Sequence, residues 1–176
     1  MRRKAGLVLA GALIAAPMLV LASTRTGTPK SLDERVRHEF LMLPYYNVFD
    51  NLSYKVEGNR VLLLGEVTNP TLKNDAEHVV RAILGVGGVT NKIEVLPPSP
   101  YDDRIRLAVL RAVYWQPGLD RYSLGAQPAI RIIVKNGNVT LDGIVNSQVD
   151  RNLAGLRANG VPGVFSVTNN LRIATS

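Results

Sequence analysis

The chain repeats one sequence pattern, and this internal repeat restricts its fold more than any other feature. Residues 58–67 read GNRVLLLGEV, and residues 136–145 read NGNVTLDGIV. The longer segments around them, 33–97 and 102–174, also align with each other. Because an internal repeat determines the architecture, we expect two copies of one folding unit.

The two copies align with two different offsets. At the start of each copy the offset is 69 residues, which pairs Asp33, Arg35 and Val36 with Asp102, Arg104 and Ile105. From the hairpin onward the offset is 78 residues, as for Gly65 and Gly143. The second copy therefore has nine additional residues within QPGLDRYSLGAQP, 116–128. Insertions are tolerated best at the surface, so we expect a surface loop there.

Each copy has the pattern of a helix, a hairpin, a second helix and a closing strand. The first helices are indicated by apolar residues at helical spacing: Val36, Phe40 and Leu43 in one copy, and Ile105, Val109 and Ala112 in the other. Two β-rich runs surround EGN at 57–59 and Asn136-Gly137, which is a strong hairpin signal. The closing strands read VTNKIEV, 89–95, and VTNNLRI, 167–173.

The second helix of each copy has its own boundary signals. Asn69 and Pro70 begin one helix, which is expected to stop at Gly85, and Ser147 begins the other, which ends at Gly160. Their predicted apolar stripes are Leu72, Ala76, Val79, Val80 and Ile83 in the first copy, and Val149, Leu153 and Leu156 in the second.

The predicted fold class is therefore α+β. We expect two tandem α-β-β-α-β domains, each a three-stranded mixed sheet packed against two helices. A right-handed crossover would place each closing strand parallel to one hairpin strand. The first predicted domain spans residues 32–96 and the second spans 101–174. The Pro-rich residues 97–100 form a short, stiff linker between them.

The N-terminus has the pattern of an export signal. Arg2, Arg3 and Lys4 precede a mostly apolar run from residue 5 to residue 22. We predict a signal peptide at 1–22, a tail at 23–31 and a periplasmic or other extracytoplasmic location. The alternative is an uncleaved inner-membrane anchor, because about 18 mostly apolar residues lie at the lower limit of the length that spans a bilayer. Pro17 disfavours such a spanning helix.

The repeated motifs resemble the BON domain, the bacterial OsmY and nodulation module. The resemblance rests on V-x-L-x-G-x-V in the hairpin and on GV-x-x-V-x-N-x-L/I-x-V/I in the closing strand. The second copy matches with NGNVTLDGIV and GVPGVFSVTNNLRI, and the first with EGNRVLLLGEV and GVGGVTNKIEV. Two copies in register cover nearly all of the chain after the leader.

The resemblance implies an exported, non-enzymatic module of the bacterial envelope, for which phospholipid binding is the activity usually proposed. The glycines of the family map to Gly65, Gly85, Gly143 and Gly163. We predict structural roles for all four. A glycine inside a strand usually marks a bulge or a close backbone approach, and one after a helix usually takes the left-handed cap position.

No sequence motif indicates catalysis. His38 and His78 fall on the polar sides of two helices, and neither has a partner at metal-ligand spacing. Asp102 and Asp103 are predicted to begin a helix and to cap its free N–H groups. The chain has no cysteine, and it contains no P-loop or hydrolase motif. We therefore expect neither a metal site nor a cofactor.

The positive charge belongs to the second copy. Residues 32–97 contain 7 Lys or Arg and 9 Asp or Glu, whereas residues 101–174 contain 9 and 5. Removal of the leader lowers the net charge from +7 to +4, which does not indicate a nucleic-acid partner. A basic second domain favours contact with an anionic surface.

The candidate lipid-binding residues all lie in the second copy: Arg104, Arg106, Arg111, Tyr114, Trp115, Arg121 and Tyr122. Arginine binds lipid phosphate, and aromatic rings settle at the level of the headgroups. The expected partner is an anionic phospholipid membrane surface. Three alternatives stay open. The arginines could form a solvated helix face with the aromatic side chains in the core, or the protein could be a scaffold that binds envelope proteins through a strand edge. The third is a polysaccharide contact through Trp115 and the tyrosines.

Overall fold

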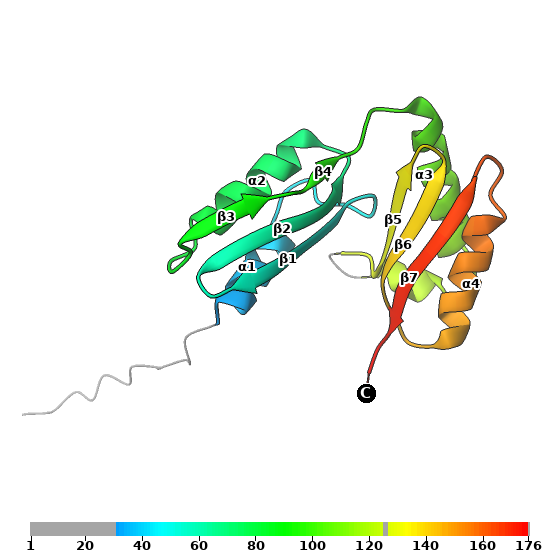
Figure 1. Ribbon diagram of the computed structural model, residues 1–176. Helices are drawn as coiled ribbons and strands as arrows, with labels where there is room; N and C mark the ends of the chain where they lie inside the picture. The colour runs from blue at the N-terminus through cyan, green and yellow to red at the C-terminus, as the bar shows by residue number, and fades with distance from the viewer. Residues whose placement is uncertain (1–30, 125–126, 176) are drawn as a thin grey trace, which may run out of the picture.

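The computed structural model describes residues 31–124 and 127–175, which form two tandem α-β-β-α-β units (Figure 1). The elements of the first domain are α1 (Leu32–Leu41), β1 (Asn51–Glu57), β2 (Arg60–Val67), α2 (Pro70–Arg81), β3 (Gly88–Asn91) and β4 (Glu94–Val95). Those of the second are α3 (Pro100–Tyr114), the 3-10 helix η1 (Asp120–Ser123), β5 (Ile130–Lys135), β6 (Asn138–Val145), α4 (Gln148–Asn159) and β7 (Ser166–Ile173). The predicted leader, 1–22, and most of the predicted tail lie outside the described residues.

Each domain has one mixed sheet, as the sequence predicts. β1 and β2 form an antiparallel hairpin, and β3 and β4 both pair with β2 in parallel. In the second domain β5 and β6 form the hairpin, and β7 runs parallel to β6. The predicted α+β fold class and the parallel closing strands are confirmed. In the first domain the closing strand is divided at Lys92 and Ile93, which separate β3 from β4.

The second helices begin where their capping residues predict. Asn69 accepts a hydrogen bond from the N–H of Thr71, and Pro70 is the first residue of α2. The Ser147 hydroxyl accepts from the N–H of Asp150 at the start of α4. The predicted end of α2 at Gly85 is wrong, because the helix ends at Arg81.

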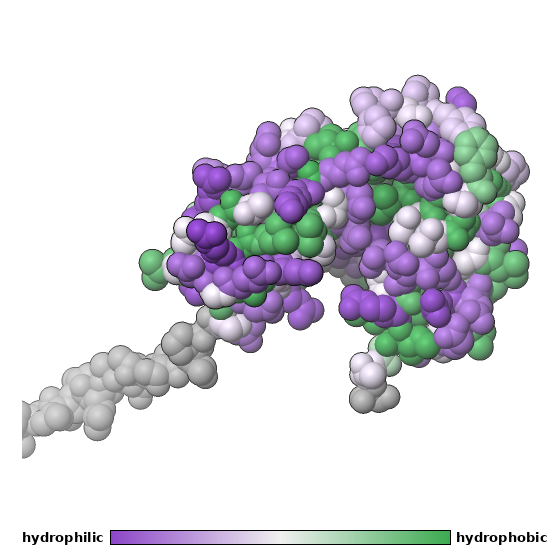
Figure 2. All heavy atoms as spheres, in the orientation of Figure 1, coloured by the Kyte–Doolittle hydropathy of each residue, from purple (hydrophilic) through white to green (hydrophobic). Residues whose placement is uncertain are grey.

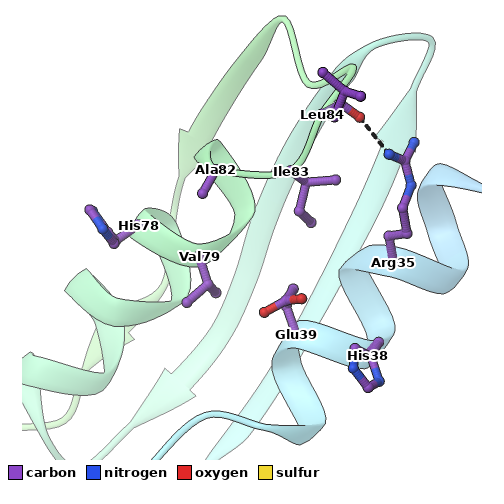
Figure 3. A pocket seen from close by; sticks show the side chains of 8 residues that line it. All are labelled: Arg35, His38, Glu39, His78, Val79, Ala82, Ile83 and Leu84. Atoms are coloured by element: carbon purple, nitrogen blue, oxygen red, sulfur yellow. Dashed lines mark hydrogen bonds between the residues drawn. The ribbon is translucent and has the colours of Figure 1, made fainter.

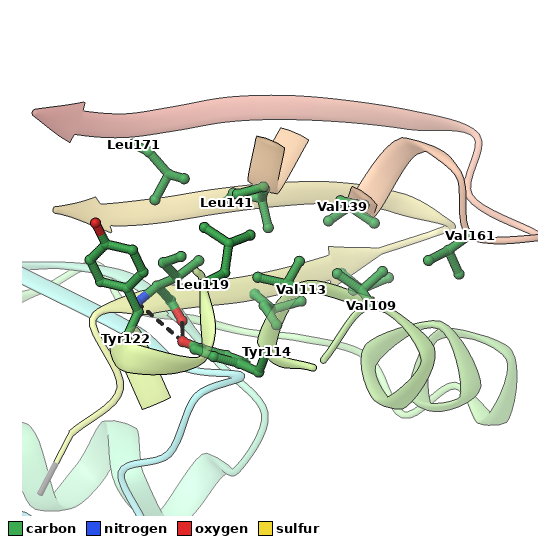
Figure 4. Packing of buried hydrophobic residues seen from close by; sticks show 14 of the residues in the cluster. Val109, Val113, Tyr114, Leu119, Tyr122, Val139, Leu141, Val161 and Leu171 are labelled. Carbon is green, nitrogen blue, oxygen red and sulfur yellow. Dashed lines mark hydrogen bonds between the residues drawn. The ribbon is translucent and has the colours of Figure 1, made fainter. Parts of the chain in front are cut away.

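The cores lie between the helices and the sheets. Val36 and Phe40 of α1 are buried against the first sheet, and Ile105 and Val109 of α3 are buried in the second domain (Figure 4). The predicted apolar stripe of α4 is right for Leu153, which packs against the core, and wrong for Val149 and Leu156. Ala154 and Ala158 face the core, whereas the side chains of Val149 and Leu156 are 73% and 68% exposed.

Gly65 in β2 and Gly143 in β6 each allow the two strands of their hairpin to approach closely. Their φ angles are +114° and +137°, and a Cβ atom at either position would overlap the carbonyl oxygen of Asn51 or of Ala129. Gly85 and Gly163 also have positive φ angles. They follow the C-cap residues of α2 and α4 by three positions, so they do not occupy the predicted cap position itself.

The inserted residues of the second copy close one end of its core. Leu119 is fully buried and Tyr122, in η1, is 6% exposed. The N–H of Ala129 donates to the carbonyl of Tyr122, which returns the chain toward β5. This insertion therefore contributes to the core as well as to the surface.

The two domains contact each other through the segment between α1 and β1. The N–H of Ile132 in β5 donates to the carbonyl of Val48 at 2.9 Å. Arg131 lies over the ring of Tyr46 at 4.5 Å, and its guanidinium donates to the carbonyl of Asn47. One segment of the first domain thus covers the outer edge of β5.

Candidate functional site

Asp102 is a buried structural residue and does not cap α3. Ser99 is the N-cap, and its hydroxyl accepts from the N–H of Asp102. The Asp102 carboxylate is 1% exposed and accepts from the N–H groups of Asn136 and Gly137 at 2.9 and 2.8 Å. The predicted capping role is wrong because Pro100 and Ser99 start the helix earlier, and Asp102 then points toward the hairpin turn.

Three of the seven candidate lipid-binding residues are buried. Arg106 is 4% exposed and donates to the carbonyl of Val134 and to Asp103. Tyr114 is 7% exposed and exchanges hydrogen bonds with the backbone of Ile130 (Figure 4). Burial raises the pKa of Tyr114 to about 12. Both residues fix α3 to β5 and are not available to a membrane.

Tyr122, the third buried candidate, and Arg121 belong to a polar cluster around Asp150. The Asp150 carboxylate accepts from Arg121 at 2.6 Å, from the Tyr122 hydroxyl at 2.8 Å and from Ser147 at 2.7 Å. Burial raises the pKa of Asp150, but these hydrogen bonds outweigh it and hold the pKa below its ordinary value. The side chain of Arg121 is 46% exposed and already paired, so this cluster has a structural role at the start of α4.

The remaining candidates lie on one exposed stripe of α3. Arg104, Arg111 and Trp115 are spaced by seven and four residues, so they face the same side of a helix. All three are exposed, and Trp115, which directly follows α3, is 77% exposed. The alternative that places the aromatic side chains in the core therefore holds for Tyr114 and not for Trp115. Tyr101 and Ala108 fall on the same side, and we call these five residues the α3 stripe: Tyr101, Arg104, Ala108, Arg111 and Trp115.

α4, which packs against α3, also has exposed apolar residues. The Tyr101 hydroxyl donates to the carbonyl of Gly163, beyond the end of α4, while Arg121, beyond the end of α3, binds Asp150 at its start. The two helices are therefore packed antiparallel (Figure 1). Val149 and Leu156 are exposed on α4, and hydrophobic side chains reach the surface over this helix in Figure 2. Sequence reasoning missed them because it assigned both to the core.

The first domain has a different stripe at the corresponding positions. With the offset of 69 residues, the α3 stripe corresponds to Leu32, Arg35, Glu39, Met42 and Tyr46. Arg35 donates to the carbonyl of Leu84, and Tyr46 lies under Arg131 at the contact between the domains. Glu39 occupies the position that corresponds to Ala108, in the middle of the α3 stripe. Only the second copy therefore presents two arginines between exposed aromatic residues on this face.

A groove of about 420 Å³ lies between α1 and α2 in the first domain. Val79 and Ile83 point into it, together with the carboxylate of Glu39 (Figure 3). His38 and His78 line the rim, and both side chains point away from the space between the helices. The carboxylate of Glu39 and the guanidinium of Arg35 both line the groove, so its charge is mixed and does not favour an anionic lipid.

A smaller polar cleft of about 270 Å³ lies between the domains. Glu66 and Glu94 line it from the first domain, and Lys135 lines it from the second and pairs with Glu94. Burial, followed by the nearby Glu94 and Asp142, raises the pKa of Glu66. Charges of both signs make this cleft a part of the contact between the domains.

Residues 31–124 and 127–175 hold neither a cluster of metal ligands nor a helix able to span a membrane. Within these ranges no three or more His, Asp or Glu side chains are placed to hold a metal ion. None of the helices there combines the length and the apolar character needed to cross a bilayer.

The repeated fold and its motifs agree with a comparison to protein families. The profile described as the BON domain matches residues 31–97 and 101–175. The two matches cover most of the chain, so the protein belongs to the BON domain family and contains two of these domains in tandem. BON domains occur in envelope-associated proteins and can bind phospholipid.

Other comparisons add little. A search of curated protein sequences gives no match. Two solved structures of CdsD, a structural protein of the type III secretion system of Chlamydia trachomatis, are similar to the chain. One, the C-terminal domain, has 12% identity and a TM-score of 0.33, with 82% of this chain and 98% of that chain covered. The other has 13% identity and a TM-score of 0.32, with 81% and 93% covered. Similarity at this level supports no functional inference.

Proposed function

We propose that the protein is a non-enzymatic envelope module whose second domain binds the surface of an anionic phospholipid membrane. The observation that supports this most is the α3 stripe, in which Arg104 and Arg111 are exposed and Trp115 is 77% exposed. Arginines bind phosphate groups, and tryptophan is favoured at the headgroup level of a bilayer. Each basic residue near an anionic leaflet contributes about 1 kcal/mol to the free energy of binding. Two arginines together with Trp115 as an aromatic anchor therefore give reversible binding.

The two repeats support this proposal as an internal comparison. The first domain has a net charge of −2 over residues 32–97, and Glu39 lies in the middle of the corresponding face. Its Arg35 is hydrogen-bonded to Leu84. An anionic surface would therefore attract the second domain more strongly than the first.

A scaffold that binds envelope proteins by strand addition is the alternative. Two of the outer strand edges are already hydrogen-bonded within the chain. The edge of β5 is covered by Val48, as described above. At the edge of β7, the carbonyl of Asn169 accepts from Arg151, and the N–H of Leu171 donates to the Asn169 side chain. These contacts oppose strand addition at the positions that they occupy. We favour lipid binding because the α3 stripe supports it directly.

Co-sedimentation with vesicles tests the proposal. Residues 23–176 are expected to pellet with vesicles that contain phosphatidylglycerol, and added salt is expected to weaken binding. Arg104→Glu combined with Arg111→Glu reverses both charges and should lower the affinity about hundredfold or more. Arg37→Glu combined with Arg60→Glu makes the same charge change on exposed residues of the first domain. Equal binding by the two double variants would refute the assigned surface.

A further inference from the structure

An exposed aromatic pair lies at the other end of α3 from Trp115. Phe165, in the turn between α4 and β7, is 72% exposed, and Tyr101 at the start of α3 is 38% exposed. Their ring centroids are 6.1 Å apart, and the rings are tilted by 33°. Hydrophobic atoms reach the surface over this turn in Figure 2. Neither residue belongs to the hydrophobic core cluster of the domain, although the Phe165 ring lies against Gly137 of the hairpin turn.

This aromatic pair is continuous with the α3 stripe. The guanidinium of Arg104 lies 5.9 Å from the centre of the Tyr101 ring. The sequence of side chains along the helix is then Phe165 and Tyr101, Arg104, Ala108, Arg111 and finally Trp115. Aromatic groups stand at both ends, two arginines lie between them, and a small residue occupies the middle. Tyr101 and Trp115 are separated by about 21 Å along the helix axis, at a rise of about 1.5 Å per residue.

We infer that the second domain binds an anionic bilayer with the axis of α3 parallel to the membrane plane, held by two aromatic anchors, Trp115 at one end and Phe165 with Tyr101 at the other. This inference rests on the proposed function. Rings at both ends of one helix face would enter the headgroup region together, while the arginines between them bind phosphates. A surface of this kind, with aromatic groups and basic residues on one face, is typical of helices that lie in the interface.

The geometry also identifies Phe165 as a membrane contact that the family motifs do not indicate. It lies between GV and V-x-N of the closing motif, at one of the positions that the motif leaves variable. The corresponding position in the first copy is Gly87. The second anchor is thus present in the second copy alone, as is the arginine pair of the α3 stripe.

A fluorescence experiment tests this orientation, because Trp115 is the only tryptophan of the chain. The probes are vesicles of phosphatidylcholine and phosphatidylglycerol with brominated acyl chains, which quench an inserted indole. Three proteins are compared: the native sequence, Trp115→Phe with Phe165→Trp, and Trp115→Phe with Leu84→Trp. Leu84 is 86% exposed in the first domain, and its variant is the matched control.

We expect the native protein and the Phe165→Trp variant to be quenched to the same extent within about twofold, and the Leu84→Trp variant to remain unquenched. In addition, Phe165→Ser should weaken vesicle affinity about tenfold without loss of the fold. Quenching of Trp115 alone, or quenching of all three proteins, would overturn the flat orientation while the lipid-binding function stands. An absence of vesicle binding by the native protein would overturn both.

Discussion

Asp102 and Asp150 are buried acidic residues that fix the two ends of the second domain. Asp102 binds the two N–H groups of the hairpin turn, and Asp150 binds Arg121 and Tyr122 of the insertion. A carboxylate that accepts several hydrogen bonds compensates for its own burial. These contacts link segments that lie far apart in the sequence.

The first prediction concerns Asp102. Asp102→Ala would leave the N–H groups of Asn136 and Gly137 without their partner, and it should lower the free energy of unfolding by about 3 kcal/mol. The corresponding residue Asp33 is exposed, so Asp33→Ala should change stability by less than about 0.5 kcal/mol. Urea denaturation of both variants measures the difference. Equal losses would show that the contact with the turn is unimportant.

For individual residues, the sequence predicted burial on the first helices correctly but missed several hydrogen-bonding roles. The buried positions of Val36, Phe40, Ile105 and Val109 followed from helical periodicity, which survives because one side of each helix faces a sheet. The roles of Arg106, Tyr114 and Tyr122 did not, because their partners are backbone groups or side chains on other elements. Tyr101 could have been found, since it lies three residues before Arg104 on the same helix side.

The elements of the two domains are alike, but the faces of their first helices are not. α3 has 15 residues and α1 has 10, and only α3 has two exposed arginines and an exposed tryptophan on one stripe. The repeat predicted the order of the elements correctly, because hairpin and capping residues are local signals. It did not predict that Val149 and Leu156 of α4 are exposed. The small side chains of Ala154 and Ala158 face the core, and the larger Val149 and Leu156 face the solvent.

The second prediction concerns the charge in the middle of the α3 stripe. Ala108→Glu introduces into the second domain the residue that the first domain has at the corresponding position, Glu39. A negative charge between Arg104 and Arg111 should weaken binding to phosphatidylglycerol vesicles about fivefold. Glu39→Ala in the first domain should leave the affinity unchanged within about twofold. Vesicle co-sedimentation measures both, and thermal unfolding of Ala108→Glu verifies that the fold is retained. A larger effect at Glu39 would contradict the assignment to the second domain.

In the whole molecule, the two domains contact each other through residues outside the Pro-rich linker that joins them. Val48 and Phe49 of the first domain pack against the core of the second. Tyr46, under Arg131, corresponds in the repeat to Trp115, which is exposed, so the two aromatic residues have different surroundings. The prolines predict a short linker between the domains. The contact between the domains was not predictable, because it joins residues about 84 positions apart, as Asn47 and Arg131 illustrate.

The third prediction concerns this contact. Arg131→Ala removes the cation–π contact with Tyr46 and the hydrogen bond to Asn47, and it should lower the free energy of unfolding by about 1 to 2 kcal/mol. Calorimetry should also show a broader transition, because the domains are then less strongly coupled. Arg172→Ala on exposed β7 is the control and should have little effect. Indistinguishable thermograms for the two variants would mean that the domains unfold independently of this contact.

The proposed contact with anionic phospholipid is made by the second domain through α3. Paramagnetic relaxation measured by NMR tests this contact most directly, with residues 23–176 on phosphatidylglycerol nanodiscs that carry a spin label on the lipid headgroup. We expect the amide signals of α3 and of the turn before β7 to broaden, while those of α1 and α2 remain sharp. Broadening that is strongest in α1 and α2, or absent from both domains, would contradict this proposal.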